Sequence, residues 1–219
     1  MAILQLQYSV FRSLEYLIFF LPALLFAAYA LLCATRAPGV RRELDNAIAS
    51  ISGHIPNITR RGWDVSLSLD SGFMQPVAIA EAELQECPFK KIRIRMHRRP
   101  GLLALSGGTC IFKIVAESPV PAKGEVLYQM PLHSEQKPIF VLKSRKGVDE
   151  VSLDPLCMDL NSEPGMMEKL GALSPSLLEL SSGAASSSIR LEFQSQTPDI
   201  SDAVSILCAM ARVAIPGGG

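Results

Sequence analysis

Nineteen consecutive residues without a charged side chain, from Tyr16 to Ala34, constrain this chain more than any other feature of its sequence. At about 1.5 Å per residue, a helix of this length reaches roughly 28 Å, which is close to the thickness of a bilayer's hydrocarbon core. Pro22 lies inside the stretch, and membrane helices tolerate proline better than helices in water do. The sequence therefore predicts a transmembrane helix over residues 16–34.

A signal peptide and a buried core helix are the two alternatives for this stretch. Signal peptides usually have about 7–15 apolar residues behind a short basic segment. Here the apolar stretch is longer and Glu15 adjoins it. A core helix this apolar is uncommon in a domain of ordinary size. We expect a retained span, with residues 1–15 lying along the membrane interface or continuing the helix.

Arginines on the C-terminal side of the span predict its orientation. Arg36, Arg41 and Arg42 follow the apolar stretch, whereas only Arg12 and the terminal amine precede it. Because Lys and Arg are enriched on the cytoplasmic side of membrane spans, we expect a single-pass protein with a cytoplasmic C-terminal domain. Tyr16 and the three following arginines are the residues expected at the membrane interface.

The five cysteines agree with a cytoplasmic domain. They are widely spaced and include no CxxC pair, so they favour neither a zinc site nor a disulfide framework. Reduced cysteines are typical of a reducing compartment. The sequence predicts no metal and no cofactor.

A second helical pattern follows the span. Ala37-Pro38-Gly39 predicts the end of the span, and an amphipathic linker helix is predicted over residues 38–55. Its apolar residues recur every three or four positions, which places them on one face. These residues are Val40, Leu44, Ile48, Ile51 and Ile55. This face is expected to pack on the chain's own domain, on the membrane surface or on a partner helix.

The remainder, residues 57–215, is predicted to form one α+β domain. From Trp63 onward the apolar residues alternate with polar ones, which is typical of antiparallel strands with one wet face. Strands are expected at 63–69, 77–79, 92–96, 102–105, 109–116, 126–130 and 139–143. Two hairpins are expected, one joining 102–105 to 109–116 and one joining 177–180 to 189–193. A short helix is expected at 166–171, and a C-terminal amphipathic helix at 199–214 with Thr197 as its N-cap. The predicted fold class is therefore a transmembrane helix followed by a mostly antiparallel, β-rich domain.

The charged residues give one candidate interaction site. The net charge is zero, although residues 1–115 hold thirteen Lys or Arg against eight Asp or Glu. The densest basic segment is Lys90–Arg99, where Lys91, Arg93, Arg95 and His97 share one face of a strand. Together with Arg98 and Arg99 they form the predicted docking site.

Three environments are compatible with this basic strand. It is expected to bind anionic lipid, to dock an acidic protein partner, or only to face solvent as a charged edge strand. Nucleic acid is disfavoured because no aromatic side chains are interleaved with the basic ones.

No catalytic motif is apparent, so the sequence predicts a protein that is not an enzyme. It contains no HExxH, GxSxG or GxxxxGK[ST] pattern. The acidic residues Glu81, Glu83 and Glu86 are expected to line an exposed edge, and those of 149–154 to form a solvated turn. The leading hypothesis is a non-catalytic accessory or structural subunit of a larger multi-subunit membrane protein complex, with other integral membrane subunits as partners. The alternative is a freestanding, membrane-tethered domain that binds anionic lipid or a soluble ligand.

Overall fold

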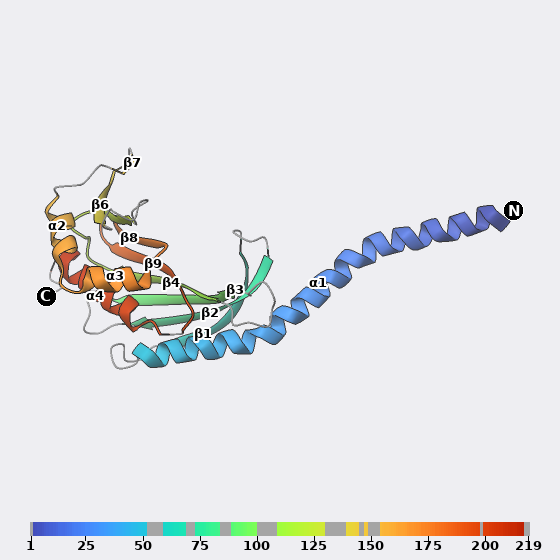
Figure 1. Ribbon diagram of the computed structural model, residues 1–219, viewed down its shortest axis with the longest axis horizontal. Helices are drawn as coiled ribbons and strands as arrows, with labels where there is room; N and C mark the ends of the chain where they lie inside the picture. The colour runs from blue at the N-terminus through green and yellow to red at the C-terminus, as the bar shows by residue number, and fades with distance from the viewer. Residues whose placement is uncertain are drawn as a thin grey trace.

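The protein has a mixed α+β fold in which a long apolar helix leads into an antiparallel sheet and shorter helices follow (Figure 1). The computed structural model describes residues 2–51, 59–68, 73–83, 89–99, 109–129, 139–144, 147–148, 154–197 and 199–216. The fold class agrees with the prediction at this level.

Helix α1 runs from Ala2 to Ile51 and contains Pro22 and Pro38. The sequence predicted that the helix would end at Ala37-Pro38-Gly39, and this prediction was wrong. Proline removes one hydrogen bond and crowds the preceding turn, which bends a helix when the turns on both sides remain intact. Figure 1 shows that α1 is curved rather than straight. The predicted linker helix therefore belongs to the second half of α1, and its predicted end at residue 55 lies outside the described residues.

The apolar stripe in the second half of α1 packs on the chain's own domain. Val40, Leu44, Ala47 and Ile51 are buried, and Ile48 packs against the same core. Helix α1 contacts strands β2 (Phe73–Glu83) and β3 (Lys91–Arg99) and helix α4 (Ser201–Ala214). Of the three locations predicted for this stripe, the structure confirms packing on the chain's own domain. Ile55 lies outside the described residues.

The strands form one sheet in the order β1-β2-β3-β4-β9-β8-β5-β6-β7, and every described pair is antiparallel. Their bounds are Thr59–Ser68 (β1), Phe73–Glu83 (β2), Lys91–Arg99 (β3), Thr109–Ser118 (β4), Val126–Gln129 (β5), Ile139–Ser144 (β6), Gly147–Val148 (β7), Leu177–Ser182 (β8) and Ser187–Ser195 (β9). The first four strands form a meander. The β8–β9 hairpin is inserted between β4 and β5, although it comes later in the chain.

Three short helices complete the domain: α2 (Pro155–Ser162), α3 (Met166–Leu173) and α4 (Ser201–Ala214). Helix α2 was not predicted; Asp154 caps it by accepting a hydrogen bond from the backbone N–H of Leu156 at 2.8 Å. Helix α4 was predicted, but Thr197 is not its N-cap. Instead, Asp199 Oδ1 accepts a hydrogen bond from the N–H of Ser201 at 2.9 Å, and this bond lowers the pKa of Asp199.

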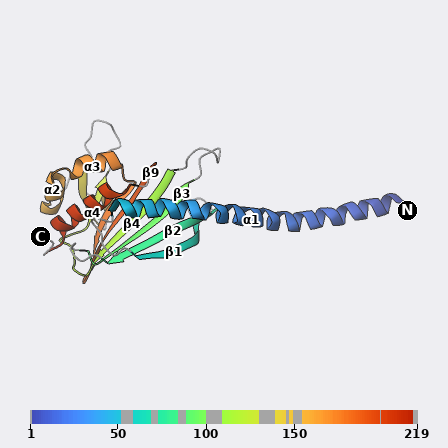
Figure 2. The ribbon, with the colours of Figure 1, turned by 90° about the horizontal axis from the view of Figure 1, so that it is seen from below.

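The core lies between one face of the sheet and the helices. Helices α1, α3 and α4 pack on strands of this face, and Figure 2 shows α1 crossing the sheet. At the centre of the core, Phe112 of β4 and Phe193 of β9 are fully buried and stack with ring centroids 5.1 Å apart. On the opposite face, the outward side chains of β3, β4 and β9 are exposed or half-buried. This second face is called the bare face below.

Candidate docking surface

Strand β3 presents its basic residues on the bare face. Ile92, Ile94 and Met96 point into the core and are at most 1% exposed. The alternate positions of the strand belong to Lys91, Arg93, Arg95 and His97, which are exposed or half-buried. Because side chains of a strand alternate between the two faces, the core residues fix these four basic residues on the outside. The predicted alternation is confirmed.

Glu81 of β2 neutralises two of the four. It is directly opposite Arg93 in the sheet and accepts a hydrogen bond from Arg93 Nε at 2.6 Å, while Lys91 Nζ lies 3.8 Å from its other oxygen. The residue is only 8% exposed, so the expectation that Glu81 lines an exposed edge was wrong. Its two cationic neighbours compensate the charge that burial would otherwise penalise.

Among the outward cations of β3, Arg95 has no acidic residue opposite it on either neighbouring strand. Its cross-strand neighbours are Ile79 on β2 and Lys113 on β4. Lys113 pairs with Glu192 of β9 at 3.2 Å, whereas Arg95 forms no ion pair among the residues that the structure describes. Like charges directly opposite each other on neighbouring strands are unfavourable. The bare face therefore has a local excess of positive charge at Arg95.

Arg98 lies on the other face of the sheet, apart from the four outward basic residues. It donates a hydrogen bond to Glu43 of α1 at 2.5 Å, and the thiol of Cys110 lies 3.3 Å from the second oxygen of Glu43. This cluster joins α1 to β3 and β4. The six predicted docking residues thus do not form one patch.

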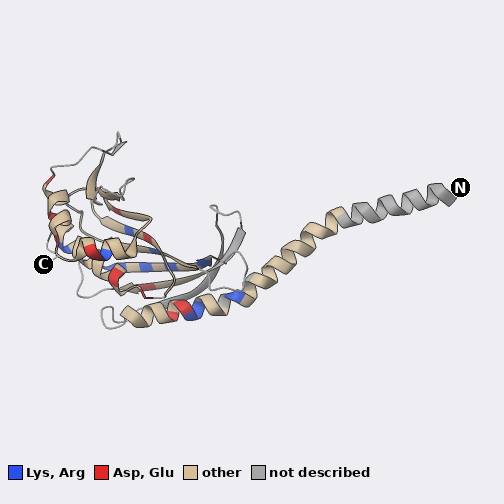
Figure 3. Cartoon of the chain, viewed as in Figure 1, with Lys and Arg blue, Asp and Glu red and all other residues tan. Residues whose placement is uncertain are grey.

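The remaining predicted residues are divided between described and undescribed side chains. Arg36, Arg41 and Arg42 are exposed on α1, where basic residues follow the uncharged part of the helix (Figure 3). The side chains of Tyr16 and Arg99 lie outside the described part of the structure.

Stability at alkaline pH is expected to depend on Cys110. Burial, and then the nearby charge of Glu43, raise the pKa of this thiol from 9.0 to about 12. A raised pKa favours folding below the unfolded value and loses that contribution as pH rises through the folded value. Between pH 9 and 12 the unfolding free energy should therefore fall more steeply in the wild type than in Cys110→Ala, by at most about 1.4 kcal/mol per pH unit. Urea titrations of both proteins at pH 8 and 10.5 measure this difference. An equal change of the unfolding free energy with pH in the two proteins would contradict the prediction.

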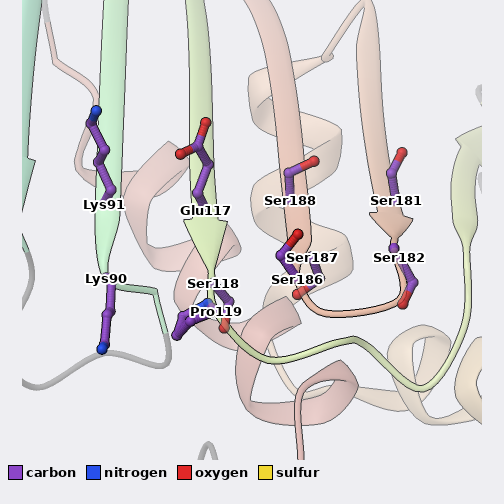
Figure 4. A pocket seen from close by; sticks show the side chains of 11 residues that line it. Lys90, Lys91, Glu117, Ser118, Pro119, Ser181, Ser182, Ser186, Ser187 and Ser188 are labelled. Atoms are coloured by element: carbon purple, nitrogen blue, oxygen red, sulfur yellow. The ribbon is translucent and has the colours of Figure 1, made fainter.

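A pocket of about 650 Å³ lies at one end of the sheet, between the start of β3 and the β8–β9 turn (Figure 4). Serines line much of it. Ser182 and Ser187 donate hydrogen bonds to the carbonyls of Ala122 and Val120, so they hold the β4–β5 connection in place. Lys90 and Lys91 also line the pocket but point in opposite directions (Figure 4). At least these two lining serines serve the fold, and the sequence had indicated only a hairpin tip here.

No family model, curated protein or solved structure matches this chain. Among the described residues, no group of three or more His, Cys, Asp or Glu is placed to hold a metal ion. We take the bare face around Arg95, with its local excess of positive charge, as the candidate docking surface among the described residues.

Proposed function

We propose that this protein is a single-pass membrane protein that serves as a non-catalytic accessory subunit of a larger membrane complex. The first half of α1 supports this proposal. From Ile18 onward the helix is long and apolar enough to cross a membrane, and its most apolar part is not buried. Its large apolar side chains are 46–79% exposed: Ile18, Phe19, Phe20, Leu21, Leu24, Leu25, Phe26, Leu31 and Leu32. So large an exposed apolar surface is unfavourable in water and favourable in lipid.

The continuity of α1 favours a subunit over a loosely tethered domain. Its exposed half and its buried half belong to one helix, so the domain is joined to the proposed span without an intervening loop. The Arg98–Glu43 ion pair and the buried Leu44 fix the helix to the sheet next to this junction. Such a junction holds the domain in a defined direction relative to the membrane. A domain that docks on a neighbouring subunit needs such a fixed direction.

The proposed orientation places the domain in the cytoplasm, because Arg36, Arg41 and Arg42 lie on the domain side of the span. A cysteine introduced at Ala184, in the exposed β8–β9 turn, is the probe. In intact cells a membrane-impermeant maleimide should fail to label it, whereas permeabilised cells should be labelled. Labelling of intact cells above that of the unmodified chain would contradict the orientation.

Purification of the tagged, full-length chain in two mild detergents tests the proposal of an accessory subunit. We expect it to migrate on native gels as an assembly with integral membrane proteins in constant ratio. A monomer in both detergents would refute the proposal. Binding of that monomer to vesicles containing phosphatidylserine, but not to neutral ones, would instead support the alternative of a freestanding lipid-binding domain.

A further inference from the structure

The bare face is the side of the sheet that faces away from helix α1 (Figure 2). The second half of α1 packs on the covered face of β2 and β3, and its first half leaves the domain at one end of the sheet (Figures 1 and 2). The direction in which the bare face looks is therefore roughly perpendicular to the helix. If α1 spans a membrane, as proposed above, this face looks along the membrane plane toward neighbouring proteins.

The ion pairs on this face leave Arg95 available to an acidic ligand. Glu81 compensates Lys91 and Arg93, and Glu192 compensates Lys113, but Arg95 lacks an acidic partner in the described part of the chain. A carboxylate brought close to Arg95 would offset its repulsion with Lys113.

Aliphatic side chains surround this charge. Ile79 lies beside Arg95 on β2, and Ile111 and Val115 lie on β4 on both sides of Lys113. All three side chains are partly exposed, because no described helix covers this face of the sheet. Arginine among apolar side chains is typical of the centre of a protein–protein interface, where charged residues other than arginine are depleted.

The position of Arg95 disfavours a lipid headgroup. The predicted span ends at Ala34. Glu43, which contacts Arg98, lies nine residues further along the helix, about 14 Å from that end. Strand β3 continues from Arg98 to Arg95 for about another 10 Å. The strand leads away from the proposed span, because its first residues lie at the end of the sheet opposite the projecting half of α1 (Figure 1). Screening limits attraction to an anionic membrane surface to about 8 Å at physiological ionic strength.

We infer that the bare face centred on Arg95 binds an acidic segment of a different protein anchored in the same membrane. This inference rests on the proposed function and names the chemistry of the partner. An aspartate or glutamate of the partner pairs with Arg95, and its apolar residues cover Ile79, Ile111 and Val115.

Photo-crosslinking of the full-length chain in its native membrane tests the inference. A photoreactive residue at Ile111 should give one protein adduct whose crosslinked peptide is rich in Asp or Glu. Arg95→Glu should reduce the adduct at least tenfold, while the control Arg212→Glu, an exposed arginine on α4, should leave it unchanged. Replacing the crosslinked acidic residue with arginine should restore the adduct with Arg95→Glu.

Three results would overturn the inference: an adduct with a second copy of this chain, an adduct with the mass of a lipid, or no adduct from a folded chain. The native-gel experiment separates this failure from that of the proposed function. If the assembly persists without an adduct at Ile111, the docking face is wrong and the subunit role stands. If the chain migrates alone, the subunit role fails as well.

Discussion

The double substitution Leu25→Arg and Phe26→Arg is expected to remove this protein from the membrane fraction. Both residues lie in the exposed apolar half of α1, near the middle of the predicted span, and each is 59% exposed. An arginine at the centre of a transmembrane helix costs about 2.5–3.5 kcal/mol on insertion scales, so the pair costs about 5–7 kcal/mol and the apolar contributions of both side chains are also lost. Carbonate extraction of membranes measures the result, and most of the variant should become soluble or be degraded.

The control for this experiment is Leu25→Ile with Phe26→Leu, which preserves the apolar character of the helix. It should remain in the pellet with the wild type. If the arginine variant also resisted extraction, the apolar half of α1 would not be the element that holds the protein in the membrane.

The substitution Phe193→Ala is expected to destabilise the domain by about 3–5 kcal/mol, because it leaves a cavity in a close-packed core. Phe193 is fully buried on β9 and stacks on Phe112 of β4. It also lies on the hairpin that joins the two parts of the sheet. This loss is a large fraction of the stability of a typical domain.

Urea unfolding of the full-length chain, followed by the circular dichroism of its strands, measures this effect. The neighbouring Gln194 is exposed, so Gln194→Ala should change the unfolding free energy by no more than about 0.5 kcal/mol. Equal midpoints for the two variants would contradict the position of the Phe112–Phe193 pair at the centre of the core.

Local patterns in the sequence predicted most of the secondary structure. The alternation around Ile92 and Ile94 and the helical spacing of Val40 and Leu44 are consequences of the two backbone periods, so they can be recognised without knowledge of the fold. Pro38 misled the prediction because tertiary packing on one side of it keeps the helix intact. Helix α2 was missed because Asp154 was interpreted as part of a solvated turn, whereas it is the N-cap.

Interactions between distant segments were not predictable from such patterns. Glu43 and Arg98 are 55 residues apart, and only the packing of α1 on the sheet brings them together. Likewise, the antiparallel register of β2 and β3 places Glu81 beside Arg93 and leaves Arg95 opposite Lys113. The sequence identified the basic strand, but the register determines which of its charges is uncompensated.

The order of the strands has a consequence for biosynthesis. Strands β4 and β5 follow each other in the chain, yet β8 and β9 separate them in the sheet. While residues 177–195 are still within the ribosome, the nascent chain has two incomplete sheets with unpaired edges, and the N-terminal helix has already emerged. The sheet is therefore completed only after β8 and β9 have left the ribosome, and a chain truncated before Leu177 should be a substrate for chaperones and proteases rather than a smaller folded protein.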